Sequence, residues 1–187
     1  MIVEFSIANT FSIQEEQTIS FEAVDDCAES GTDGASPLGA SSRPCGAHCV
    51  TIGGRTLLKA ACIYGANASG KTNILTALRF YVRFACDSFP SLKPAEETHF
   101  VPFRFDEESA RDPGYFNLVF FMRGDGDGAG KAVLYDYELL LCATHVVKEK
   151  LSAQAAGGRR RLVYERSSDG SVRWGSGTSG AKKLVAD

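Results

Sequence analysis

Long apolar runs are absent from this sequence of 187 residues. No stretch approaches the roughly 20 consecutive apolar residues that a membrane-spanning helix needs. The N-terminus alternates charged and apolar residues, unlike the continuous apolar run of a signal peptide. These absences argue against a membrane segment and a secretory leader. We therefore expect a cytoplasmic protein that makes no contact with a membrane.

A surplus of one charge sign is absent too. Lysine and arginine number 20 against 23 aspartate and glutamate residues, which leaves a formal net charge of −3. This balance provides no general attraction to nucleic acid, although the run of Arg159, Arg160 and Arg161 could touch a phosphate locally. A short basic run is weak evidence for such contact, and we interpret it as a solvated turn between strands.

The chain does contain enough apolar material for one core. Hydrophobic residues make up 44% of the sequence and aromatic residues 10%, which is typical of a globular protein and unlike a disordered one. A single domain is the default for a chain of this length.

A phosphate-binding loop is the most specific motif present. The pattern G-x-x-x-x-G-K-[ST] is complete over eight consecutive residues, namely Gly65, Ala66, Asn67, Ala68, Ser69, Gly70, Lys71 and Thr72. The backbone N–H groups of such a loop surround phosphate oxygens at the positive end of a helix dipole. Lys71 is then expected to neutralise the β- and γ-phosphates, and the Thr72 hydroxyl to ligate Mg²⁺.

The sequence on either side of the loop fits this interpretation. Residues 57–64 are mostly apolar and predict a buried strand, and residues 72–88 carry apolar side chains at helical spacing. The expected packed face of the helix consists of Ile74, Leu78, Tyr81, Val82 and Ala85. A strand before the loop and a helix after it are the context that the motif requires. The sequence therefore predicts binding of a nucleoside triphosphate.

Alternating apolar residues predict a largely antiparallel β-structure around this unit. Residues 2–7 and 17–23 predict one hairpin, and residues 115–122 and 132–141 predict a second. Further strands are expected within 145–151, 161–166 and 171–174, and a short extended segment at 99–106.

Domain limits follow from changes in composition. Residues 25–54 are rich in small and polar residues and predict a long, flexible loop. The structured domain is expected over residues 1–174, and residues 175–187 are expected to be a frayed tail.

Isolated residues provide no second site. Two of the six cysteines, Cys62 and Cys86, lie in the strand and helix beside the phosphate loop, so we expect free thiols. A set of four could ligate zinc, but its spacing is not one of the usual patterns; it comprises Cys27, Cys45, His48 and Cys49. The histidines, which also include His99 and His145, are too scattered to form a catalytic set.

Residues 57–75, with Asn67 at the third loop position, resemble the start of AAA-family ATP-binding proteins of the OLD and abortive-infection type, relatives of the ABC, SMC and RecF ATPases. Ring-forming AAA+ machines usually place proline where Asn67 stands. Weaker similarities, such as the Asn-x-Phe-Ser turn at residues 9–12, cover most of the chain outside 25–54 and the tail.

This resemblance implies an α/β fold, the N-terminal lobe of an ABC-type P-loop NTPase with an antiparallel β-subdomain. It also implies that residues 65–73, including Asn73, bind Mg-ATP. Such ATPases hydrolyse ATP with a Walker B strand, a Leu-Ser-x-Gly signature from a second unit and a switch histidine, and the sequence contains none of them.

We therefore expect an N-terminal half that binds ATP with little or no hydrolysis. The expected partner is a second ATPase half or another copy of the chain. Family analogy alone adds a setting of phage defence or DNA processing, with a nuclease and nucleic acid as partners.

Two alternatives remain open at this point. A P-loop kinase for a small molecule would need arginines near the acceptor, and Arg104, Arg111 and Arg123 are the candidates. A non-catalytic interaction module derived from such an ATPase would bind no nucleotide.

Overall fold

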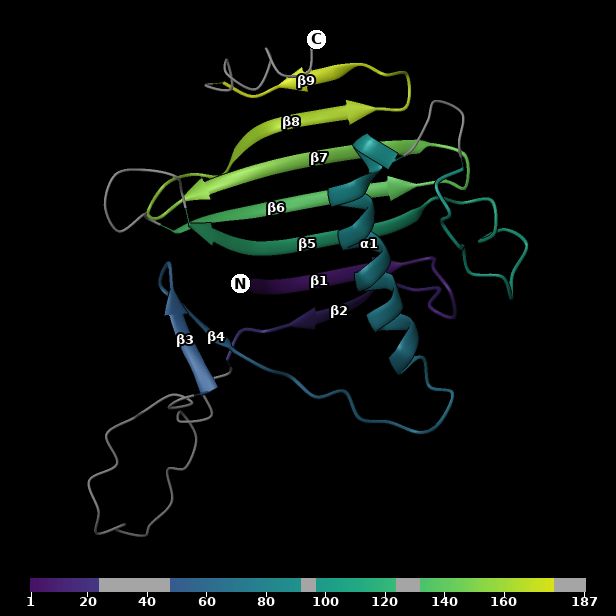
Figure 1. Cartoon of the computed structure of the whole chain (residues 1–187), viewed down its shortest axis with the longest axis horizontal. Helices are drawn as coiled ribbons and strands as arrows, with labels where there is room; N and C mark the ends of the chain where they lie inside the picture. The colour runs from purple at the N-terminus through teal and green to yellow at the C-terminus, as the bar shows by residue number, and fades with distance from the viewer. Residues whose placement is uncertain (24–47, 92–96, 124–131, 177–187) are drawn as a thin grey trace, which may run out of the picture.

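A seven-stranded antiparallel sheet forms the body of the protein (Figure 1). The computed structural model describes residues 1–23, 48–91, 97–123 and 132–176. The strand order is β2-β1-β5-β6-β7-β8-β9. The strands span Ile2–Ala8 (β1), Gln17–Ser20 (β2), Gly114–Arg123 (β5), Ala132–Leu141 (β6), Val146–Ala155 (β7), Arg161–Ser167 (β8) and Val172–Trp174 (β9). The two predicted hairpins and the later meander are confirmed.

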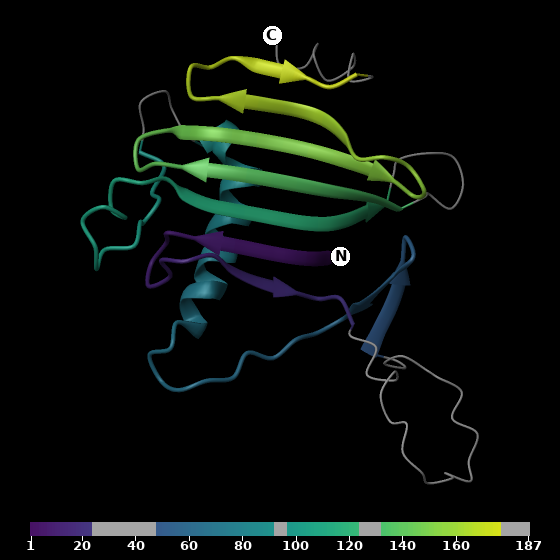
Figure 2. The same ribbon diagram turned by 180° about the vertical axis from the view of Figure 1, so that it is seen from behind.

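One long helix, α1 (Lys71–Ser91), crosses one face of this sheet, as the two opposite views show (Figure 1, Figure 2). The helix and strands β1, β5 and β6 enclose the larger of two hydrophobic clusters. Its strand residues are Phe5, Ile7, Phe116, Leu118, Leu139 and Leu141. The protein is thus a mixed α/β structure, as the sequence predicts.

Tyr81 lies at the centre of the contact between helix and sheet. Its side chain is 1% exposed, and its ring lies 6.0 Å from that of Phe5 and 5.9 Å from that of Phe116. The Tyr81 hydroxyl donates a 2.6 Å hydrogen bond to the carbonyl of Tyr137 on β6. Aromatic burial and a satisfied hydroxyl together fix how the helix sits on the sheet.

The buried stripe of α1 differs in part from the predicted one. It consists of Ile74, Ala77, Leu78, Tyr81 and Phe84, at the three-to-four spacing of one helix face. Val82 and Ala85, which we expected on this face, are exposed instead. Each lies one position beyond a stripe residue, and one position turns a side chain by about 100° around the helix.

A two-stranded hairpin packs on the second cluster. It consists of β3 (Cys49–Ile52) and β4 (Arg55–Leu58), joined through Gly53 and Gly54 with φ values of 60° and 82°. Two positive φ values in a two-residue turn suit glycine. Leu57 of β4 packs with strand residues of the main sheet, namely Val3, Phe121 and Leu134.

The hairpin corrects two predictions. Residues 49–52 form a strand within the stretch 25–54 that was expected to be a loop, and residues 25–47 of that stretch lie outside the described residues. The strand expected over 57–64 ends at Leu58. Lys59 N still donates to His48 O at 2.9 Å beside the hairpin. A strand needs backbone partners on a neighbouring strand, and the described structure pairs no strand with residues 60–64. Residues 99–106 also run without regular structure.

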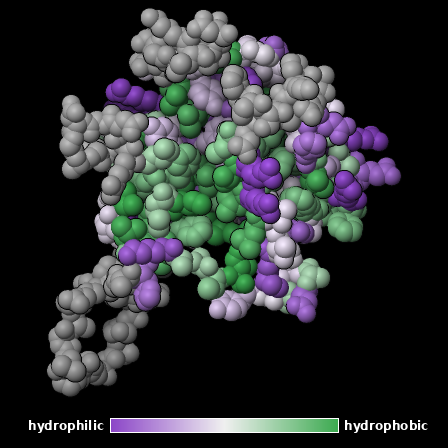
Figure 3. Space-filling view, in the orientation of Figure 1, coloured by the Kyte–Doolittle hydropathy of each residue, from purple (hydrophilic) through white to green (hydrophobic). Residues whose placement is uncertain are grey.

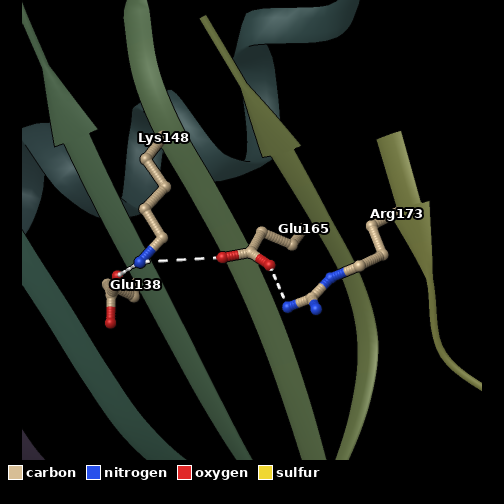
Figure 4. Close-up of polar contacts among 4 residues, drawn as sticks. All are labelled: Glu138, Lys148, Glu165 and Arg173. Atoms are coloured by element: carbon tan, nitrogen blue, oxygen red, sulfur yellow. Dashed lines mark hydrogen bonds and ion pairs between the residues drawn. The ribbon is translucent and has the colours of Figure 1, made fainter. Parts of the chain in front are cut away.

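Charged residues line the face of the sheet away from α1 (Figure 4). Lys148 Nζ lies 2.8 Å from Glu138 Oε1 and 3.7 Å from Glu165 Oε1, and Glu165 also pairs with Arg173. The hydrogen bond to Glu138 raises the pKa of Lys148, and the bond from Arg173 lowers the pKa of Glu165. The ladder thus joins strands β6 to β9 through alternating charges.

The other face remains apolar beside the helix (Figure 3). There Phe120 stacks on Tyr135 with ring centroids 5.7 Å apart, and Met122 is 55% exposed. The two faces of the sheet therefore differ: one carries charged side chains, and the other is apolar and is crossed by α1.

We expect the free energy of unfolding to fall steeply above pH 10. Burial raises the pKa of Tyr81, Tyr137 and Tyr164 above the ordinary value of 10, and the Glu149 carboxylate adds to each shift. These tyrosines ionise near pH 10 in the unfolded state, whereas in the folded state they remain protonated at that pH. The stabilisation that these three protonated tyrosines contribute is therefore complete below pH 10. It is lost as the pH rises from 10 toward their raised pKa values, by up to about 1.4 kcal/mol per tyrosine and pH unit.

Thermal unfolding followed between about pH 8 and pH 11 measures this slope. Replacement of Tyr164 by phenylalanine removes one of the three contributions and should make the slope shallower. Full tyrosinate absorbance in a protein that stays folded above pH 10 would contradict the expectation.

Candidate phosphate-binding site

Residues 65–70 connect the irregular segment 59–64 to the first residue of α1. The loop lies where the helix begins, beside the turn between β1 and β2 (Figure 1). It is exposed except for Gly70, which is half-buried. The structure thus brings all of the predicted residues 65–73 together at one helix N-terminus.

The backbone of the loop turns sharply before the helix. Ala68 and Gly70 have φ values of 63° and 89°, in the left-handed region, and Ser69 N donates to Ala66 O at 3.3 Å. Helical bonding begins with Ile74 N donating to Gly70 O at 3.2 Å. The N–H groups ahead of this bond have no carbonyl partner one turn earlier in the helix. With the helix dipole behind them, they form an environment that suits an anion.

Lys71 arches back over the loop that precedes it. Its Nζ donates to the carbonyl oxygens of Gly65 at 2.8 Å and Ala66 at 2.5 Å, and lies 3.4 Å from Ser69 Oγ. The ammonium group therefore lies over the concave side of the loop. A phosphate oxygen is a stronger partner for this cation than a neutral carbonyl, because the bond then joins two charges.

Thr72 and Asn73 both lie in the first turn of α1, and their side chains differ in hydrogen bonding. Thr72 is exposed, and in the described part of the chain its hydroxyl makes no hydrogen bond. That hydroxyl is a hard oxygen donor of the kind that Mg²⁺ accepts. Asn73 Nδ2 instead donates to Ser12 Oγ at 2.7 Å. The donor set around the loop thus fits a magnesium-bound triphosphate.

The β1–β2 turn, residues 9–13, is a part of the site that reasoning from the sequence missed. An ideal Cβ added to Gly70 would lie 3.3 Å from Ser12 Oγ, so this turn touches the loop as well as α1. The Asn-x-Phe-Ser pattern at residues 9–12 was the available signal. It indicated a turn, but 57 residues separate Ser12 from Gly70, and local sequence patterns do not report such contacts.

The segment 97–113 supports this turn from behind. Asn9 Nδ2 donates to the carbonyls of Ser109 at 2.8 Å and Asp112 at 2.9 Å. Asp106 Oδ2 in turn accepts bonds from Ser109 N at 2.8 Å and Ser109 Oγ at 2.7 Å, and these bonds lower the pKa of the Asp106 carboxyl. The sequence indicated an extended segment at 99–106 here, and the structure adds a turn held by specific hydrogen bonds.

The arginines considered for a kinase acceptor site do not gather. Arg104 and Arg111 lie in the segment 97–113, beside the start of β5, whereas Arg123 is the last residue of that ten-residue strand. Ten residues of extended strand span roughly 30 Å. The run at Arg159 and Arg160 lies in an exposed turn between β7 and β8, as expected, and Arg161 begins β8. Arg160 pairs with Asp136 of β6.

Other predicted ligands form no site in the described residues. Among the described residues, Cys49, Cys62, Cys86 and Cys142 make no disulfide, and no three His, Cys, Asp or Glu residues gather as a metal-binding group. Cys27 and Cys45 lie outside the described residues. Within the described range, α1 included, no helix has the length and hydropathy needed to cross a bilayer.

Comparison with known proteins identifies a family for the chain. Residues 60–173 match the model of the family described as "AAA domain, putative AbiEii toxin, Type IV TA system". No curated protein and no solved structure matches the chain. The matched residues include the loop, α1 and the sheet from β5 onward. Because the match spans more than half of its length, the chain belongs to this family of P-loop AAA-type ATPase domains.

Proposed function

We propose that the chain binds Mg-ATP through residues 65–73, as the N-terminal half of an ABC- or OLD-like ATPase of an abortive-infection system. The observation that carries the proposal is the position of Lys71 Nζ, 2.8 Å from Gly65 O and 2.5 Å from Ala66 O over the loop. A left-handed Gly70 supports it, as do the first N–H groups of α1 and the Thr72 hydroxyl, for which the described residues provide no hydrogen-bond acceptor.

Each residue has a defined role in this proposal. Lys71 turns its ammonium group from the loop carbonyls to the β- and γ-phosphates, and the loop N–H groups donate to the remaining phosphate oxygens. The Thr72 hydroxyl would hold the magnesium ion, which would supply positive charge against the phosphates. Gly70 makes the turn possible, because a side chain there would be strained by its φ of 89° and would crowd Ser12.

Hydrolysis needs groups beyond this loop. Phosphoryl transfer to water depends on an oriented water and on charge around the transferred group. The sequence has neither an apolar run ending in Asp-Glu nor a Leu-Ser-x-Gly motif. In the proposal these groups come from a second ATPase half or another copy of the chain, and a nuclease and nucleic acid follow only from family analogy.

Replacement of Lys71 by alanine should weaken ATP binding by about 10- to 100-fold, since charge-assisted bonds contribute roughly 1.5–3 kcal/mol. Isothermal titration of the whole chain with Mg-ATP measures this change. Lys150→Ala, on the sheet and far along the sequence from the loop, is the matched control and should bind like the unmodified protein. Equal affinity of the Lys71 and Lys150 variants would refute the proposal, and no binding by the unmodified chain would favour an interaction module.

Thr72→Ala should remove the part of the affinity that depends on magnesium. The same titration in Mg²⁺ and in EDTA separates the two contributions. Thr76→Ala is the control, because its hydroxyl lies one turn along α1 and donates to Thr72 O at 2.9 Å. A magnesium effect of the same size in Thr72→Ala and in the unmodified chain would exclude Thr72 as a ligand.

The chain alone should turn over Mg-ATP little or not at all. Release of inorganic phosphate from the purified chain measures this directly. Brisk turnover that Lys71→Ala abolishes would show that the chain contains its own catalytic groups. Phosphate found on a small-molecule acceptor would instead support a kinase.

A further inference from the structure

The turn between β1 and β2 is held in a costly backbone conformation. Asn9 and Phe11 have φ values of 50° and 52°, and a left-handed conformation costs a residue with a side chain roughly 1–2 kcal/mol. Thr10 and Ile13 exchange backbone bonds of 2.8 and 2.9 Å across the turn. The surrounding structure must therefore favour this shape strongly enough to offset its cost.

The supports of the turn come from the segment between α1 and β5. Thr10 Oγ1 donates to Val101 O at 3.0 Å, and Phe11 N donates to the same carbonyl at 3.2 Å. Asn9 is 8% exposed, and besides the bonds that its Nδ2 donates, its Oδ1 accepts from Phe103 N at 3.3 Å. The turn is thus fixed at its base.

Its exposed tip reaches the phosphate loop. Ser12 Oγ accepts a 2.7 Å hydrogen bond from Asn73 Nδ2 and lies beside Gly70. Ser12 belongs to the fixed turn, and Asn73 belongs to the first turn of the helix that carries Lys71 and Thr72. This hydrogen bond therefore links a turn that is hydrogen-bonded to the segment before β5 with the residues that would hold the nucleotide.

Backbone strain is concentrated at this corner. The described residues other than glycine that have positive φ are Asn9, Phe11, Ala68 and His99. The first two belong to the turn, Ala68 belongs to the loop, and His99 lies two residues before Val101, which supports the turn. Strained residues of this kind tend to gather where a site is preorganised.

We propose that Ser12 is a positioning residue for the phosphate loop, acting through Asn73. The bond from Asn73 sets the first turn of α1 against the β1–β2 turn, and so places Lys71 and Thr72 for a triphosphate. The inference rests on the proposed function, and it deepens that function by assigning a role to a residue outside the loop motif. An angular or positional error of the first helical turn would misplace several phosphate contacts at once.

A double-mutant cycle tests this role. Ser12→Ala and Asn73→Ala should each weaken Mg-ATP binding by about 3- to 10-fold, the size expected when one neutral hydrogen bond is lost. The double variant should bind no more weakly than the weaker single variant, because both changes remove the same bond. Isothermal titration of the full chain measures all four affinities.

Rescue and controls separate positioning from general stability. Ser12→Thr keeps the hydroxyl and should restore binding. Ser20→Ala should leave binding unchanged, because the bond that the Ser20 hydroxyl accepts in the described structure comes from Glu22 N. The unfolding midpoint without nucleotide should be the same for Ser12→Ala and Ser20→Ala. If Ser12→Ala lowers the unfolding midpoint, and its loss of Mg-ATP affinity is explained by that lower stability, the positioning role is wrong.

The remaining outcomes distinguish the two proposals. If the unmodified chain binds Mg-ATP and Ser12→Ala binds equally well, the positioning role is wrong and the proposed function stands. If the affinity losses of the two single variants add in the double variant, the positioning role is also wrong. If the unmodified chain binds no Mg-ATP, the proposed function fails and the role of Ser12 fails with it.

Discussion

The contact between Tyr81 and the sheet is the interaction on which the rest of the structure depends. Its ring is buried among Phe5, Phe116 and Tyr137, and its hydroxyl donates to a backbone carbonyl of β6. Dispersion and burial bring the helix onto the sheet, but they do so without direction. The hydrogen bond adds direction, because an unsatisfied buried hydroxyl would be costly. Helix position and hence loop position follow from this contact.

The phosphate loop is attached to the protein from two sides. Behind it, the buried stripe of α1 holds the helix on the sheet. Beside it, the β1–β2 turn contacts Gly70 and Asn73 through Ser12. The turn itself rests on Asn9, whose amide joins it to the segment before β5. Residues from the first dozen positions of the chain and from positions near 110 thus shape a site whose motif lies between them.

Different parts of this structure were predictable to different degrees. The paired strands were predictable because period-two alternation is local and strong in β5 and β6. The end of β4 was not, because residues 60–64 have the composition of a strand but pair with no strand in the described structure. On α1, Val82 and Ala85 were misplaced because a helical pattern can be phased in more than one way when apolar residues are numerous. The Ser12 contact could not be predicted, because it joins residues far apart in the sequence.

The sequence by itself determined the phosphate-binding motif, the helix that follows it and the antiparallel hairpins, since each depends on neighbouring residues and their periodicity. Only the tertiary structure decided which face of α1 is buried, where β4 ends and which turn lies against the loop. These features depend on contacts between segments separated by dozens of residues. For the same reason the eight residues of the loop specify its local conformation. The packing of Tyr81 and the Ser12–Asn73 bond decide the position of the loop relative to the sheet and the β1–β2 turn.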